Sequence, residues 1–223
     1  MTLAYINIVR IKRLVACMEY DIRTEIINCN KCNKIDGVML TKPDAFYGGV
    51  KPKVMIIGHS PTVRTSEQAD VVLKLDNPNR ALYKYINNNI LQPLGITIND
   101  IYCTNLIKCY TEKLPEDVNS KNKNYIEEIT GNCFDLLEKE IESINPQLII
   151  SLSGRVFEII AERYMNKKLK IKNCYGILCN INILGKDIKY IPVVHIPKSK
   201  RIKDYYFPEQ TNRLQALKGT LCT

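Results

Sequence analysis

Three short apolar runs constrain the fold of this chain more strongly than any other feature of its sequence. Each contains β-branched residues, and they occupy residues 54–57, 101–107 and 148–152. Strands that are buried on both faces of a parallel sheet have this character. Helical segments are expected around these runs, at residues 78–91, 125–143 and 155–164. Strands that alternate with helices predict an α/β fold with three layers, α/β/α, around a central, mostly parallel four-stranded sheet.

The C-terminal part supplies the fourth strand of this expected sheet. Residues 175–183 and 188–194 are typical of a hairpin, and its second arm is the expected core strand. A basic loop at residues 195–203 follows, and a short helix is expected near residues 208–218.

The chain shows no internal repeat and no low-complexity linker, so we expect a single domain over residues 1–223. Residues 1–50 should contain N-terminal helices and a first pair of cysteines. The polar residues 110–132 are expected to form an insertion, irregular in its first half.

Ligands of open parallel sheets bind beyond the carboxyl ends of the strands. The loops expected at that edge contain residues 58–64, 108–111, 153–155 and 195–203. An active site is therefore expected among these four loops.

The formal net charge of +9 favours contact with a polyanion such as nucleic acid. A lysine-rich genome would produce the same charge without any function. The N-terminal segment is interrupted by Arg10, Lys12 and Arg13 and does not read as a signal peptide. No apolar run has the ~20 residues of a membrane span. We therefore expect a cytoplasmic protein, monomeric and without a membrane partner.

In a reducing compartment, the nine cysteines do not indicate a disulfide framework. Cys29 and Cys32 have the two-residue spacing at which two thiolates meet one metal or cluster, while Cys109 follows a strand and Cys133 lies in a helix. Four thiolates can hold zinc or a [4Fe–4S] cluster. The alternative is that cysteines are small buried apolar residues. That alternative is expected for the other five, Cys17, Cys103, Cys174, Cys179 and Cys222.

Several motifs occur in an order that resembles a known family. Cys29-x-x-Cys32 is followed by Gly58-His59-Ser60-Pro61 and by Asn105-Leu-Ile-Lys108-Cys109. Next comes a helix–Pro–strand segment that starts at Cys133 and contains Pro146, and then His195-Ile-Pro197. This arrangement resembles the iron–sulfur uracil-DNA glycosylases of bacteria and archaea, family 4 of the uracil-DNA glycosylase superfamily. The resemblance covers about residues 20–200.

The resemblance implies an enzyme that flips a nucleotide out of DNA and hydrolyses the bond between base and sugar. It makes His195 the hydrogen-bond donor to the departing base and Asn105 the side chain that binds the base, next to Gly58 and Pro61. It implies a [4Fe–4S] cluster, rather than zinc, on Cys29, Cys32, Cys109 and Cys133. DNA phosphates would meet the loop after His195, which carries Lys198, Lys200, Arg201 and Lys203, with Ile202 or Tyr205 as a wedge.

The chain departs from the family in its glycine loop. Family members carry a carboxylate or an amide just after the glycine, and this chain has His59 and Ser60 there. A neutral His59 could act as a base toward water, so His59 and Ser60 are catalytic candidates. Glu67, Asp70 or Asp76 could replace the missing carboxylate.

The family's aromatic residue that stacks on uracil also has no counterpart between Thr65 and Asp76. The two absences favour a base bulkier than uracil, for example a modified base of foreign DNA. Two alternatives remain open. One is a catalytically silent DNA-binding member of the same fold, and the other is a zinc-stabilised α/β protein acting on nucleotides.

Overall fold

The computed structural model describes residues 22–61, 70–112, 123–196, 200 and 202–221. Its centre is a six-stranded sheet of order β2-β4-β3-β6-β8-β7. The strands are β2 (Phe46–Tyr47), β3 (Val54–Gly58), β4 (Ile101–Asn105), β6 (Leu148–Leu152), β7 (Cys179–Ile183) and β8 (Lys186–Val193). The four inner strands are parallel, and each edge strand is antiparallel to its neighbour. The predicted fold class is confirmed, with two antiparallel edge strands added to the expected four.

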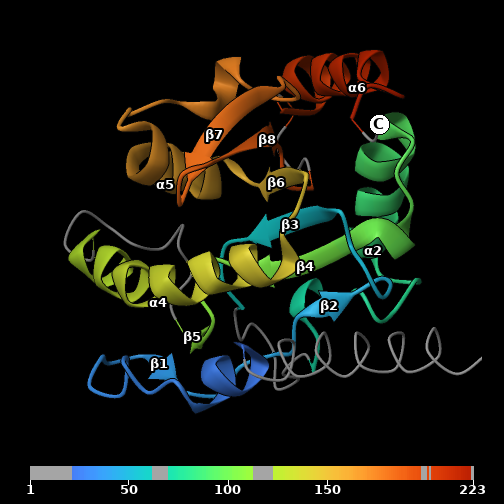
Figure 1. Cartoon of the computed structure of the whole chain (residues 1–223). Coiled ribbons are helices and arrows are strands. Elements are labelled where there is room, and N and C mark those ends of the chain that lie inside the picture. The colour runs from blue at the N-terminus through green and yellow to red at the C-terminus, as the bar shows by residue number, and fades with distance from the viewer. Residues whose placement is uncertain (1–21, 62–69, 113–122, 197–199, 201, 222–223) are drawn as a thin grey trace, which may run out of the picture.

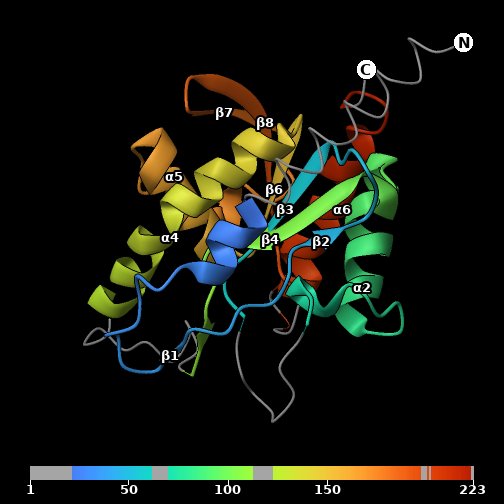
Figure 2. The same ribbon diagram turned by 60° about the horizontal axis from the view of Figure 1, so that its bottom comes forward.

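Helices cover both faces of the sheet (Figures 1 and 2). Figure 2 shows α4 (Lys123–Ile144) and α5 (Gly154–Met165) on one side, with α2 (Ala81–Ile86) and α6 (Phe207–Ala216) on the other. The chain continues from α2 through a π-helical turn, η2 (Asn87–Leu91), into α3 (Gln92–Leu94). Because both faces are covered, every residue of β3, β4 and β6 is buried.

Smaller elements complete the described chain. Residues 22–28 are helical, as expected for the end of the N-terminal helices. A two-stranded ladder pairs β1 (Val38–Met39) with β5 (Tyr110–Thr111). Single helical turns are η1 (Val72–Lys74), η3 (Ile98–Asp100), η5 (Ile171–Asn173) and η6 (Ile202–Tyr206).

Three predicted boundaries are wrong. The strand expected over residues 101–107 ends at Asn105, where the chain turns along the loop after β3. The expected insertion at residues 110–132 begins with β5 and ends inside α4, which starts at Lys123. Its middle, residues 113–122, lies outside the described residues. The hairpin turn has only two residues, Leu184 and Gly185, because both have positive φ and so match the twist of the flanking strands.

The strand order places a topological switch point between β3 and β6. The chain leaves β3 for β4 on one side and later returns to β6 on the other side of β3. Open α/β sheets bind ligands at such a point, beyond the carboxyl ends of the strands. Among the described residues, no helix is both long and apolar enough to cross a bilayer.

Candidate active site and cysteine centre

The floor of the candidate site is Gly58, at the carboxyl end of β3, which is in register with Asn105 of β4. A Cβ atom on Gly58 would lie 2.3 Å from Asn105 Oδ1 and 3.0 Å from Leu73 Cδ2. Only glycine leaves room for both side chains. The position therefore explains why the loop begins with glycine.

The Asn105 side chain is buried, and its Oδ1 atom has no hydrogen-bond partner in the described structure. Buried amide oxygens are nearly always hydrogen-bonded, because leaving one unpaired costs free energy. An unpaired acceptor at the end of a parallel strand is therefore available to a ligand.

Backbone hydrogen bonds hold the glycine loop beside the segment that follows β4. Leu106 N–H donates to Gly58 O at 2.8 Å, and Ile107 N–H donates to His59 O at 2.9 Å. Thr111 N–H donates to the carbonyl of the buried Pro61 at 3.2 Å. The two loops are thus fixed against each other beyond the end of the strands.

His59 is a half-buried polar side chain with one buried, unpaired atom. Its Nδ1 lies 3.1 Å from Ser60 Oγ, and its buried Nε2 has no partner in the described structure. Burial, together with the positive charge of Arg155, lowers the pKa of His59 to about 4. The imidazole is therefore neutral near pH 7, with one ring nitrogen donating and the other accepting.

Arg155 reaches this site from β6 and α5. Ser153 has a φ of 119°, and its Oγ accepts from Val156 N–H at 3.3 Å, so it caps α5 in a strained turn. Arg155 follows two residues later and acts on His59. The sequence placed residues 153–155 at the working edge of the sheet but assigned no role to Arg155. The only signal was its position directly after a buried strand.

His195 lies just beyond the end of β8, at the same edge of the sheet, and its side chain is exposed. The loop before it is fixed from two helices. Tyr85 OH donates to Val194 O at 2.7 Å, and Val194 N–H donates to Gln210 Oε1 at 2.7 Å. The backbone at the start of the His195 loop therefore has a defined position.

The basic loop is only partly described. Lys200 and Lys203 are exposed, whereas Lys198 and Arg201 lie outside the described residues. Of the two expected wedge residues, Tyr205 is 72% exposed and Ile202 packs against the core.

The candidates for the missing carboxylate are not placed in the site. Asp70 and Asp76 are exposed, and Glu67 lies outside the described residues. Residues 62–69, which include part of the segment expected to carry the stacking aromatic residue, also lie outside the described residues. The described side chain that packs against Gly58 is the aliphatic Leu73.

The four predicted cysteine ligands come from three segments and influence one another. Cys32, Cys109 and Cys133 are buried, and Cys29 is half-buried. A hydrogen bond with Cys109 lowers the pKa of Cys32 to about 6 and raises that of Cys109, so this pair favours a single negative charge. Burial, with the charges of Cys32 and Cys29, raises the pKa of Cys133.

The donor set fits a thiolate-bound group by its chemistry and by its burial. The four side chains do not converge around a single ion in this structure. The described residues contain no group of three or more His, Cys, Asp or Glu side chains placed to hold a metal ion. Cys103 is fully buried within β4 and belongs to the apolar core around the sheet, as expected for a small buried residue.

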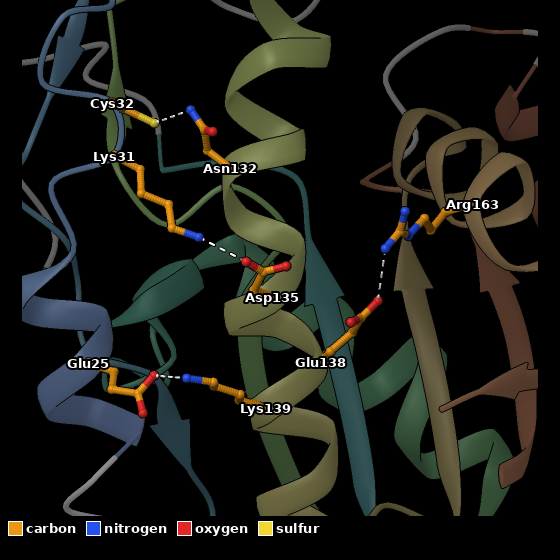
Figure 3. Close-up of polar contacts among 8 residues, drawn as sticks. All are labelled: Glu25, Lys31, Cys32, Asn132, Asp135, Glu138, Lys139 and Arg163. Atoms are coloured by element: carbon orange, nitrogen blue, oxygen red, sulfur yellow. Dashed lines mark hydrogen bonds and ion pairs between the residues drawn. The ribbon is translucent and has the colours of Figure 1, made fainter. Parts of the chain in front are cut away.

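Ion pairs and hydrogen bonds attach the first cysteine pair to α4 (Figure 3). Lys31 pairs with Asp135 at 2.9 Å, Lys139 pairs with Glu25, and Asn132 Nδ2 donates to Cys32 Sγ at 3.6 Å. Behind the turn, Lys42 Nζ donates to Cys29 O at 2.8 Å. Sequence reasoning did not find these supports, because each joins segments that are distant in the chain.

Most of the chain is similar to known proteins. Residues 45–210 match the family model of the uracil DNA glycosylase superfamily. A type-4 uracil-DNA glycosylase of Archaeoglobus fulgidus is 25% identical over 179 residues, which cover 78% of this chain and 79% of the relative. A type-4 uracil-DNA glycosylase of Saccharolobus solfataricus is 29% identical over 177 residues, which cover 78% of this chain and 73% of the relative.

Proposed function

Because the chain belongs to the uracil-DNA glycosylase superfamily, we propose that it is a DNA glycosylase acting on a flipped-out uracil, or on another non-standard or modified base. One observation carries the proposal. His59 Nε2 and Asn105 Oδ1 are buried at the carboxyl ends of β3 and β4 without hydrogen-bond partners in the described structure. A bound nucleotide would supply the partners that the described residues do not provide. Two relatives named type-4 uracil-DNA glycosylases support the same class of reaction.

In this proposal Asn105 reads the edge of the base. A side-chain amide both donates and accepts hydrogen bonds, as recognition of a base edge requires. Gly58 leaves the space in which the amide turns toward the base, and Pro61 holds the loop beneath it.

His59 and Ser60 would handle the attacking water. With Nδ1–H donating to Ser60 Oγ, the unprotonated Nε2 accepts a hydrogen bond from water. The water oxygen then bonds to the anomeric carbon of the sugar as the bond from that carbon to the base breaks. The base leaves with the electron pair, and the water's proton passes to Nε2. A neutral imidazole does not repel the cation-like sugar, which a protonated one would do.

His195 is proposed to donate a hydrogen bond to the departing base oxygen, where negative charge develops. Lys198, Lys200, Arg201 and Lys203 are proposed to contact DNA phosphates, each contact being weakened by added salt. The exposure of His195, Lys200 and Lys203 supports this assignment, because a duplex can reach them.

We assign Cys29, Cys32, Cys109 and Cys133 to a [4Fe–4S] cluster, on their donor chemistry and burial and on the resemblance to the type-4 enzymes. When bound, it would supply a cross-link between the N-terminal segment, the chain after β4 and α4.

The proposed substrate is a base bulkier than uracil, as modified bases of foreign DNA are. Two features support it. The position after Gly58 carries no carboxylate, and aliphatic Leu73, rather than an aromatic ring, packs against the glycine.

The test is a base-release assay on duplex and single-stranded oligonucleotides that carry uracil, hypoxanthine or modified cytosines. We expect abasic sites from at least one modified base. His59→Ala should lower the rate, and Lys168→Ala, at an exposed site just beyond the C-terminal end of α5, should not. Release of uracil alone, at full speed, would refute the bulky-base assignment.

A second candidate is a silent DNA-binding member of the fold, which the missing carboxylate favours. It predicts salt-dependent DNA binding without base release from any oligonucleotide of the panel. That outcome would overturn the glycosylase proposal.

A further inference from the structure

Between the candidate site and the cysteine centre lies a buried ion pair. Lys108 Nζ pairs with Glu140 Oε2 of α4, and their side chains are 4% and 0% exposed. Burying two charges is expensive and is tolerated only where further hydrogen bonds satisfy them.

Every donor of the Lys108 ammonium is used. Besides Glu140, Nζ donates to Thr104 Oγ1 and to the backbone carbonyl of Asn105, both at 2.7 Å. The Thr104 hydroxyl in turn donates to Glu140 Oε1 at 2.8 Å, and Tyr102 OH donates to the same oxygen. One charged network therefore fixes the C-terminal end of β4.

Lys108 also reaches the cysteine centre. It directly precedes Cys109 in the chain. Glu140 lies two helical turns after Cys133 on the same helix, α4. A cavity of about 20 Å³, large enough for one water, adjoins Thr104, Asn105, Lys108 and Glu140.

We propose that Lys108 is a positioning residue for Asn105. Its ammonium fixes the backbone of the base-reading residue. Cys109 follows Lys108 directly in the chain, and the partner of Lys108, Glu140, shares α4 with Cys133. The position of the Asn105 amide therefore depends on the structure of the cysteine centre. A pair of apolar side chains would fill the same space at lower cost, and it would leave the Asn105 carbonyl without a partner. This inference rests on the proposed function of Asn105.

The test compares two double variants. Lys108→Met/Glu140→Gln removes both buried charges and keeps an acceptor for Tyr102 and Thr104. The matched control, Lys168→Met/Glu162→Gln, makes the same changes in an exposed ion pair at the C-terminal end of α5 and just beyond it. For each we measure urea unfolding, the single-turnover rate of base release, the affinity for DNA, and the visible absorbance of any group bound to the cysteines.

We expect Lys108→Met/Glu140→Gln to remain folded and to bind DNA within about two-fold of the wild type. Its base-release rate should fall roughly 10- to 100-fold, as a displaced recognition group does. The control should keep its rate. If the folded Lys108→Met/Glu140→Gln variant keeps the full base-release rate, the pair only stabilises the fold and the inference is overturned.

A second measurement separates this inference from the proposed function. The side-chain amide signal of Asn105 in ¹H–¹⁵N spectra, assigned with Asn105→Asp, should shift in Lys108→Met/Glu140→Gln and in Cys133→Ser, and not in the control. An unshifted signal in both variants would refute positioning by Lys108 even if the enzyme is active. A shifted signal in a protein that releases no base would refute the proposed function and leave the coupling standing.

Discussion

Two groups of polar side chains with buried atoms meet near the carboxyl ends of β3 and β4, and they differ in one respect. In the network of Tyr102, Thr104, Lys108 and Glu140, the charged atoms have partners inside the protein. In the pair of His59 and Asn105, one buried atom of each has none among the described residues. The first group leaves no unpaired charge for a ligand to satisfy, whereas the second retains a free-energy cost that a ligand can relieve. The first group therefore supports the site, and the second group forms the site itself.

The largest effect should come from breaking the satisfied network. Glu140→Ala leaves the Lys108 charge buried and unpaired, so we expect the free energy of unfolding to fall by about 3–5 kcal/mol. Urea unfolding measures it, with exposed Glu142→Ala as the control. A loss below about 1 kcal/mol would mean that water reaches Lys108 and that the network is not the closed support described above.

The next effect is a pH dependence caused by His59. Its pKa is about 4 in the folded protein, below the ordinary value of 6.5. The unfolded chain therefore binds a proton that the folded chain refuses, so stability falls as the pH decreases from about 6.5 to 4. The shift corresponds to about 3 kcal/mol. Urea unfolding at pH 7 and pH 4.5 should show a smaller loss for His59→Gln than for the wild type, and equal losses would contradict burial of the imidazole.

Gly58→Ala should separate the two groups. The added methyl group would lie 2.3 Å from Asn105 Oδ1, so the amide or the loop must move, at a cost of about 1–3 kcal/mol. We expect base release to be lost while the protein stays folded. Gly131→Ala is the control, because nothing lies within 4 Å of a Cβ atom there. An active Gly58→Ala variant would show that Asn105 does not read the base from this position.

The smallest effect on stability is expected from Asn105→Leu. This change removes the unpaired oxygen and keeps the volume, so the free energy of unfolding should change by less than about 1 kcal/mol. Thermal unfolding measures it. A loss as large as that of Glu140→Ala would mean that Asn105 belongs to the supporting network, and the contrast between the two groups would fail.

The sequence predicted the parallel core because buried β-branched runs need no distant partner to be recognised, and the third run matches β6 residue for residue. Boundaries set by tertiary contacts were missed. β4 ends at Asn105 because Leu106 and Ile107 bond to the loop after β3, and no local pattern shows such a bond.

The candidate site was predictable to the same extent. Resemblance named Asn105, His59 and the four cysteines, since each stands in a motif. It gave Lys108 a place in a motif without a role, because its partner Glu140 lies 32 residues away in a helix. Arg155 was missed for the same reason. Its effect on His59 depends on how β6 and β3 are paired in space.

The most direct test of the contrast is the release of free bases by the wild type and by Asn105→Leu. Both proteins are incubated with DNA that carries a panel of modified bases, and the released bases are identified by mass spectrometry. We predict that the wild type releases at least one base, and that the folded Asn105→Leu variant releases that base at a rate reduced at least roughly 100-fold. Equal release by both proteins would contradict the central claim that the unpaired atoms at the end of β3 and β4 face the substrate.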